Sequence, residues 1–259
     1  MKTSGFRPKN ILITVKAYPI PSLSYGETVC CAGVDMETRD WIRLYPVPFR
    51  DLDPQQRFAK YNVVRANCAK ATDDHRPESF RIQAASIEII DNLDTKEKWR
   101  KRKEIVMSAP RMGLCELLRS QDESGMSFGL TKPRAISFES ERRSPKSPEK
   151  VEKAYSRPTL FDKQKQKIEN IPFQFYYQFF CMDNEDCPGH KLPITDWEIN
   201  QAFRDWRFRY PEIDVLLEKI KAKWLDLTNP MTKDAFLFVG NLHRFRNQFV
   251  VLGVFSPPI

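Results

Sequence analysis

The segment Asp73–Ser79, DDHRPES, gathers carboxylates, an imidazole and a guanidinium between two expected strands. Loops held by a rigid scaffold are where binding and catalytic side chains concentrate. Asp74 and His75 can supply a general base or metal ligands, and Arg76 can clamp a phosphate. The alternative is a structural turn, because Asp and Pro favour turns and Arg76 can pair with a neighbouring acid. We therefore treat the segment as a candidate catalytic site with a structural alternative.

A second group combines Cys181, Cys187 and His190 within ten residues. Thiolate and imidazole are ligands that zinc prefers, so these side chains are candidate zinc ligands. Their spacing is looser than in a short zinc knuckle, and a fourth ligand would have to come from His75, His243 or a carboxylate. The alternative is a pair of buried thiols beside a Pro-Gly turn. Zinc is thus a possible cofactor, and the interpretation requires none.

Two acids, Asp196 and Glu198, follow the cysteine group on either side of Trp197. Either carboxylate could activate a water molecule or stabilise a cationic centre. Asp196 also suits the N-cap of a helix that begins at Trp197, which is a purely structural role. Together they form the second candidate catalytic site.

Arginines alternate with aromatic side chains in three stretches, at 41–50, 203–210 and 243–246. Aromatic faces between guanidinium groups suit unpaired bases and their phosphates. The alternative for 203–210 is an amphipathic helix whose apolar face packs in the core. A basic helix expected over 95–107 adds further cations. The predicted nucleic-acid contacts are Trp41, Arg43, Tyr45, Arg50, Arg76, Arg100, Lys101, Arg204, Arg207 and Arg209.

The charge balance points to the same partner. The chain has 42 Lys and Arg residues against 34 Asp and Glu residues, a net charge of +8, which attracts phosphate backbones and favours DNA as partner. Neither a membrane span nor a signal peptide is recognised, and the six cysteines are scattered, so we expect a cytoplasmic protein. P-loop, GxGxxG, HExxH and GxSxG motifs are absent, which disfavours the common NTPases, dinucleotide oxidoreductases and serine hydrolases.

Short β-branched and aromatic runs between polar turns predict strands toward both ends of the chain. The first ninety residues hold five such runs and suit an OB-like barrel, and a second β-rich unit with two helices begins near Ile171. The expected fold class is α+β, with two β-rich, OB-like barrel modules joined by basic helical segments. The expected divisions are a barrel over 1–92, a helical connector over 93–138, a charged linker or mobile loop over 139–167, and a C-terminal module over 168–259.

The run 29–46, VCCAGVDMETRDWIRLYP, resembles the opening of dual-OB-like bacterial proteins found in conflict and defence loci. The segments 74–79, 187–190 and 196–198 are similar to landmarks of the same largely uncharacterised family. The resemblance spans most of the chain and assigns no catalytic residue. Because defence loci include glycosylases that excise modified bases from phage DNA, it implies such chemistry by association alone.

We therefore expect a DNA-binding protein, and propose a hydrolase that cleaves the N-glycosidic bond of a modified base. That reaction needs a basic groove, a wedge for a flipped base and one carboxylate. Asp74, Asp196 or Glu198 would be the acid, with His75 as its proton partner. The alternatives are a non-catalytic nucleic-acid-binding module, a metal-dependent nuclease that uses the acids of 73–78, and an adaptor whose aromatic surfaces contact protein.

Overall fold

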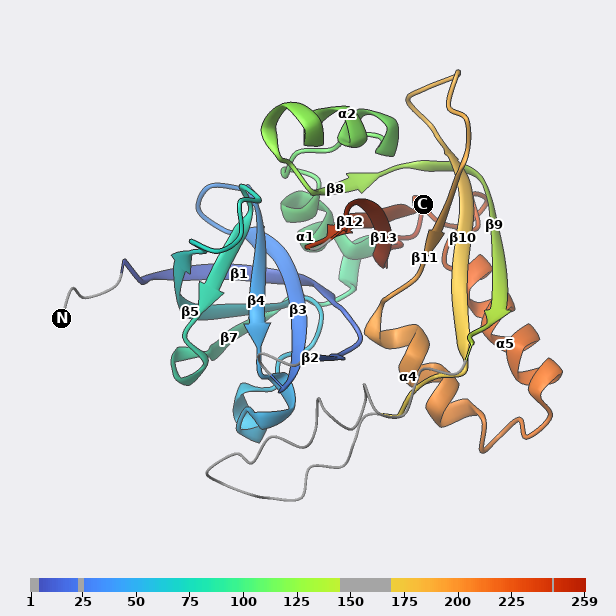
Figure 1. The fold of residues 1–259 in the computed structure, drawn as a ribbon, viewed down its shortest axis with the longest axis horizontal. Helices are drawn as coiled ribbons and strands as arrows, with labels where there is room; N and C mark the ends of the chain where they lie inside the picture. The colour runs from blue at the N-terminus through green and yellow to red at the C-terminus, as the bar shows by residue number, and fades with distance from the viewer. Residues whose placement is uncertain (1–4, 23–25, 145–168, 244) are drawn as a thin grey trace.

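The computed structural model describes residues 5–22, 26–144, 169–243 and 245–259 of the 259-residue chain. Those residues form a mixed α+β fold, with a barrel near the N-terminus and two smaller antiparallel sheets beyond it (Figure 1). The expected α+β class is confirmed. Every helix among the described residues is too short or too polar to cross a membrane.

The barrel is a closed ring of five strands in the order β1-β3-β4-β6-β5, with β5 pairing back to β1. Two shorter strands extend it, β2 beside β3 and β7 beside β5. One contact in the ring, between β4 and β6, is parallel. The strands are β1 (Arg7–Lys16), β2 (Ile20–Ser22), β3 (Gly26–Asp35), β4 (Trp41–Val47), β5 (Asn62–Lys70), β6 (Ser79–Ile82) and β7 (Glu88–Asn92). The expected N-terminal barrel is confirmed.

Strand β1 shows why the barrel is buried on both sides. Ile11 and Ile13 point inward and pack in the interior cluster of the barrel. Leu12 and Val15 belong instead to a second cluster on the outer face. Because successive side chains of a strand point to opposite faces, the unbroken buried run from Ile11 to Val15 means that both faces are covered.

The second β-rich unit forms two three-stranded sheets, where a second barrel was expected. One sheet has the order β8-β12-β13, and the other has the order β9-β10-β11. The bounds are β8 (Phe128–Thr131), β9 (Pro133–Arg142), β10 (Phe173–Cys181), β11 (His190–Pro193), β12 (Phe236–Leu242) and β13 (Phe245–Phe255). Strands β8 and β9 come from the segment expected to be a helical connector and its charged continuation. Residues 145–167 of the expected linker lie outside the described residues.

Four helices are described, α1 (Lys96–Val106), α2 (Leu114–Ser124), α4 (Trp197–Trp206) and α5 (Ile213–Asp226). An apolar stripe on α5 packs in the core of the second region through Leu216, Ile220 and Trp224. The first turn of α1 is left-handed, with positive φ at three consecutive non-glycine residues, Glu97, Lys98 and Trp99. L-residues adopt this conformation at an energetic cost, so α1 begins in a strained turn.

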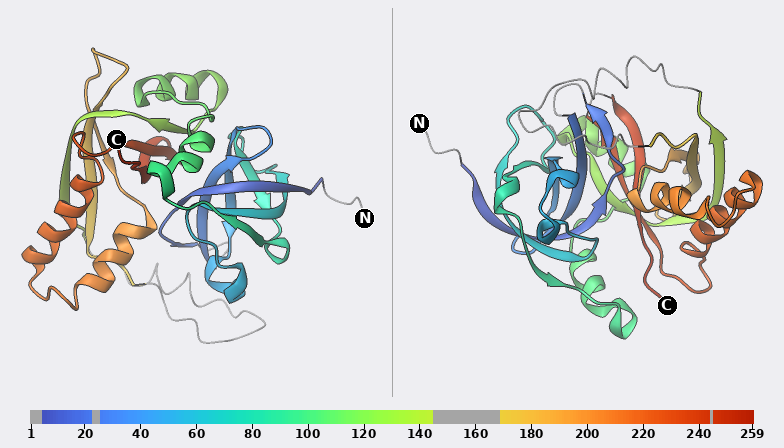
Figure 2. Two further views of the ribbon diagram at one scale, coloured as in Figure 1. Left: turned by 180° about the vertical axis from the view of Figure 1, so that it is seen from behind. Right: turned by 90° about the horizontal axis from the view of Figure 1, so that it is seen from below.

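The barrel packs its outer face against the sheet β8-β12-β13 (Figures 1 and 2). Trp41 and Val63 from the barrel share one cluster with Phe128, Phe238 and Phe255 from the second region. Figure 2 shows α1 at the border between the two parts. A continuous apolar core therefore joins the first hundred residues to the rest of the chain, rather than a flexible linker.

Candidate functional site

The side chains of Cys115, Cys181, Cys187 and His190 converge on one point. The His190 Nε2 atom lies 3.3, 3.4 and 3.2 Å from the Sγ atoms of Cys115, Cys181 and Cys187. The Cys115 sulfur lies 3.5 Å from the Cys187 sulfur and 3.8 Å from the Cys181 sulfur. In the part of the chain that the structure describes, no other group of three or more potential metal ligands occurs.

These separations fit a tetrahedral metal ion. Zn–S bonds of about 2.3 Å and a Zn–N bond of about 2.0 Å place the sulfurs about 3.8 Å apart and the nitrogen about 3.5 Å from each sulfur. The observed values are equal to these or a few tenths of an ångström shorter. Four protein ligands would fill the coordination shell, as in structural zinc sites, and leave no position for a substrate.

The pKa shifts within the cluster differ: burial raises the pKa of Cys115 and raises that of Cys181 to about 12. Although burial alone would raise it, hydrogen bonds from the backbone N–H groups of Cys181 and Gly189 lower the pKa of Cys187. The Cys181 N–H lies 3.2 Å from the Cys187 sulfur. Burial lowers the pKa of His190, which favours the neutral imidazole that metals require.

Three separate elements deliver the four side chains. Cys181 ends β10, His190 begins β11, and Cys187 lies in the loop between these strands. Cys115 lies in the first turn of α2, and the Asp183 carboxylate accepts a 2.8 Å hydrogen bond from the backbone of Gly113, just before that helix. A Cβ atom at position 113 would lie 2.2 Å from the Asp183 carboxylate, so this contact requires glycine.

The fourth ligand differs from the expected candidates. His75 and His243 are exposed and lie outside the cluster, and no carboxylate belongs to it. Cys115 is 66 residues before Cys181 and has no local motif around it. Only the tertiary contact between α2 and the β10–β11 hairpin identifies it.

The segment 73–79 is held by ion pairs and hydrogen bonds. Asp74 forms a two-point ion pair with Arg76, with nitrogen–oxygen distances of 2.9 and 2.6 Å. Although burial alone would raise it, Arg76 holds the pKa of Asp74 well below its ordinary value. Asp73 pairs with Arg81, and Glu78 accepts a hydrogen bond from Ser127. Because these acids are committed to different partners, they do not converge on one metal position.

The second candidate pair of acids meets a lysine from the barrel. The Lys60 Nζ atom lies 2.8 Å from Asp196 and 3.0 Å from Glu198. Asp196 is buried and caps α4 by accepting a hydrogen bond from the Glu198 N–H, so its predicted capping role is confirmed. Burial raises the pKa of Asp196 to about 6. Glu198 remains exposed.

Three of the predicted nucleic-acid contacts lie in the interface between the barrel and the second region. Trp41 is 7% exposed, and its Nε1 donates to the Pro110 carbonyl at 2.7 Å. Arg43 is 3% exposed and donates to the Ser127 carbonyl. Arg76 is 8% exposed. The structure thus corrects the expectation that these three side chains contact a nucleic acid, because folding removes them from the surface.

The other predicted contacts divide into two groups. Tyr45 and Arg50 are half-buried, and Arg204 and Arg207 both pair with Glu169. The remaining three, Arg100, Lys101 and Arg209, are exposed. Two of these belong to α1, which therefore presents the predicted contacts most openly.

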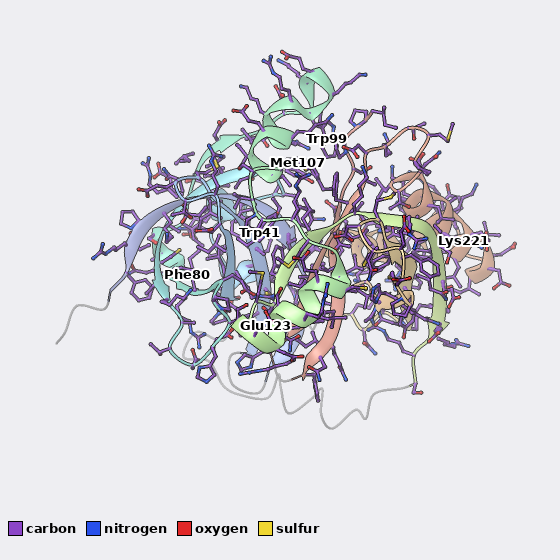
Figure 3. The ribbon with its side chains drawn as sticks, turned by 90° about the horizontal axis from the view of Figure 1, so that it is seen from above. Trp41, Phe80, Trp99, Met107, Glu123 and Lys221 are labelled. Atoms are coloured by element: carbon purple, nitrogen blue, oxygen red, sulfur yellow. The ribbon has the colours of Figure 1, made fainter. Side chains whose placement is uncertain are left out.

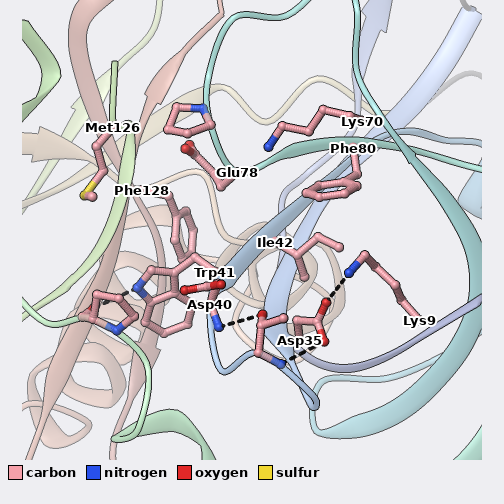
Figure 4. Close-up of a pocket in the computed structure, with 13 residues that line it drawn as sticks. Lys9, Asp35, Asp40, Trp41, Ile42, Lys70, Glu78, Phe80, Met126 and Phe128 are labelled. Atoms are coloured by element: carbon pink, nitrogen blue, oxygen red, sulfur yellow. Dashed lines mark hydrogen bonds and ion pairs between the residues drawn. The ribbon is translucent and has the colours of Figure 1, made fainter. Parts of the chain in front are cut away.

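A pocket of about 370 Å³ lies where the barrel meets the second region (Figure 4). We call it the junction pocket. Its lining combines apolar side chains, three carboxylates and two lysines, namely Lys9, Asp35, Thr38, Asp40, Trp41, Ile42, Lys70, Pro77, Glu78, Phe80, Pro110, Met126 and Phe128. Sequence reasoning missed the pocket because its walls are brought together from six separate stretches of the chain.

Comparison with known proteins divides the chain into two parts. The model of the family described as Domain of unknown function (DUF8757) matches residues 110–259, more than half of the chain. A second family, described as Domain of unknown function (DUF8758), matches residues 7–108. No curated protein matches the sequence. The two matches meet between α1 and α2, at residue 109.

Proposed function

Since the chain belongs to the family described as Domain of unknown function (DUF8757), we propose its function from its own side chains. The protein binds nucleic acid, DNA in preference, through the basic helix α1. A resemblance to dual-OB-like proteins of defence loci supports a role for this binding in antiphage defence. All six cysteines are free thiols, which supports a reducing, cytoplasmic setting.

The exposure of the α1 cations carries this proposal. Lys96, Lys98, Arg100 and Lys101 are all exposed, and the helix stands at the upper edge of the molecule in Figure 3. Among the described residues, Lys98 and Lys101 form no ion pair. The pairs made by Lys96 and Arg100 are exposed, so water screens them and a phosphate can replace their partners.

The face of the barrel is a weaker candidate than α1. In OB-type barrels, the second and third strands and their flanking loops bind oligonucleotides. The strands at those places in this ring are β3 and β4, and Val34 and Trp41 pack there against the second region. The basic helix α1 is therefore the surface that remains exposed for nucleic acid.

Salt-dependent DNA binding tests the proposal. A double variant, Lys98→Glu with Lys101→Glu, should weaken binding and lower the slope of log K against log salt by about 2, because each lost phosphate contact removes roughly 0.9. A matched control on α5, Lys219→Glu with Lys223→Glu, makes the same change of charge and should keep the slope. Affinity that does not depend on salt, or equal effects in both variants, would refute binding through α1.

The cysteine–histidine cluster has a separate role in this proposal. Cys115, Cys181, Cys187 and His190 bind one zinc ion, supported by their tetrahedral spacing. The ion is structural and fixes α2 to the β10–β11 hairpin. α2 precedes β8, whose Phe128 lines the junction pocket, so the zinc ion supports one wall of that pocket.

A second candidate function is hydrolysis of the N-glycosidic bond of a modified base. The junction pocket favours it, because Asp40 contributes a carboxylate to a pocket with apolar walls. A base extruded from the helix could enter, and the carboxylate would take a proton from the water that attacks the sugar as the base leaves. The acids of 73–78 are committed elsewhere, so the geometry favours this reaction over a metal-dependent nuclease.

Alkali treatment separates the reactions. Plain and base-modified DNA is incubated with the protein, with and without EDTA, and then heated in alkali. For this hydrolase, we expect strand breaks that appear only after alkali treatment. Asp40→Asn should abolish these breaks, whereas Asp74→Asn and Glu198→Gln should retain them. Direct cuts that EDTA prevents would indicate a nuclease, and no product on any substrate would leave a non-catalytic binding module.

A further inference from the structure

The junction pocket contains two charged side chains that no ion pair neutralises within the described part of the chain. Asp40 is exposed just before β4, at the rim of the pocket, and its carboxylate forms neither an ion pair nor a hydrogen bond there. Lys70, at the end of β5, lies 4.6 Å from the centre of the Phe80 ring but pairs with no acid. A ligand could therefore use one free acceptor and one free cation.

The other charges of the pocket are already satisfied. Asp35 pairs with Lys9 at 2.5 Å and accepts hydrogen bonds from the backbone of residues 37 and 38. Glu78 accepts a hydrogen bond from Ser127 and lies 3.6 Å from Arg43. These groups shape the pocket, and they leave Asp40 and Lys70 as its recognition groups.

The walls of the pocket suit a flat, uncharged ring. Trp41, Phe80 and Phe128 contribute aromatic surface, and Ile42 and Met126 contribute aliphatic surface. The volume of about 370 Å³ is at the small end of the range for small-molecule pockets, about 300–1,000 Å³. In Figure 4, Asp40 lies next to Trp41 on one side of the pocket, and Lys70 lies by Phe80 on the other.

We propose that the junction pocket binds a single nucleotide whose base carries an exocyclic amino group. Asp40 accepts a hydrogen bond from that amino group, the aromatic walls hold the ring, and Lys70 binds the phosphate. Carboxylates read the amino group of cytosine in this way, whereas thymine presents carbonyl oxygens that repel them. This inference rests on the proposed nucleic-acid binding, names the base that the same protein admits, and is an alternative to a hydrolytic role of Asp40.

Calorimetric titration with dCMP and dTMP tests the selectivity. The wild-type protein should bind dCMP roughly tenfold more tightly than dTMP, which corresponds to one good hydrogen-bond pair. Asp40→Ala should reduce this ratio to less than about twofold, because the acceptor is lost. Asp214→Ala removes an exposed acid from α5 and should leave the ratio unchanged.

A second variant tests the phosphate contact. Lys70→Ala should weaken dCMP binding roughly tenfold and leave the binding of deoxycytidine, which has no phosphate, unchanged. Lys223→Ala on α5 is the matched control and should change neither. Circular dichroism and thermal melting of each variant show whether it is folded.

Binding of oligonucleotides shows whether the pocket takes a base within a DNA strand or a free nucleotide. An oligothymidine with one central cytosine should bind more tightly than pure oligothymidine, and Asp40→Ala should abolish the difference. Binding of free dCMP without that difference would assign the pocket to a free nucleotide. Equal binding of dCMP and dTMP, or no effect of Asp40→Ala, overturns the inference. Salt-dependent DNA binding through α1 is measured separately and can stand when this inference fails.

Discussion

The ammonium of Lys60, just before β5, lies 2.8 Å from the carboxylate of Asp196, the N-cap of α4. The pair joins the barrel to the second region, and both side chains are almost completely buried. Ion pairs at such depth must offset the cost of leaving water. Its two members therefore respond to pH in ways that an exposed pair would not.

Acidification should reveal the burial of Asp196. Burial raises its pKa to about 6, above the value of about 3.9 in the unfolded chain. An acid with a raised pKa contributes stability that is full below the unfolded value and is lost as pH rises through about 6. The free energy of unfolding of the wild type, relative to Asp196→Asn, should rise by about 2 kcal/mol from pH 7 to pH 4.

Urea unfolding at several pH values measures this difference. Asn caps helices nearly as well as Asp, so the variant keeps the structural role of the residue. Loss of metal in acid affects both proteins equally and cancels in the comparison. A difference that is flat with pH, or that falls toward pH 4, would contradict the prediction.

Removal of one thiol should remove the zinc ion. Cys115→Ala leaves three ligands, so the zinc content should fall from about one per chain to near zero. Cys68→Ala removes another buried thiol, outside the cluster, and should keep the metal. Elemental analysis of the purified proteins gives the ratio. Wild-type protein that contains no zinc and takes none up would argue against the site.

Arg43 and Glu78 form a buried ion pair, and removing only one member should destabilise the protein more than replacing both. Glu78→Leu leaves the arginine charge without its acid between the two regions and should cost about 3–5 kcal/mol of stability. The double variant Arg43→Met with Glu78→Leu should be less damaging than the single one. Equal losses in the two proteins, measured by urea unfolding, would mean that the pair is not coupled.

The left-handed start of α1 predicts an unusual response to glycine. Lys98 has a φ of 53°, so Lys98→Gly should relieve strain and raise stability by about 1 kcal/mol. Lys101→Gly, in the regular part of the same helix, should lower stability by about 1 kcal/mol. Thermal unfolding distinguishes the two. A loss of stability at both positions would show that the first turn is right-handed in solution.

The local sequence determined the elements that depend on neighbouring residues. The β-branched and aromatic runs of the barrel strands, the apolar stripe of α5 and the Asp196 cap follow from side chains a few positions apart. Cys181, Cys187 and His190 were recognisable as ligands for the same reason. Strand β8 was missed because four residues give too short a pattern to be recognised within a segment expected to be helical.

Only the tertiary structure decided which polar side chains remain available. Trp41 and Arg43 are residue types that often contact nucleic acid, but the sheet β8-β12-β13 covers them. No local sequence pattern encodes that packing. Cys115 joined the group of potential metal ligands, and Asp40 and Lys70 became the free charges of the junction pocket, through contacts between distant segments. Such contacts depend on how complete elements pack, because burial is a property of the whole fold.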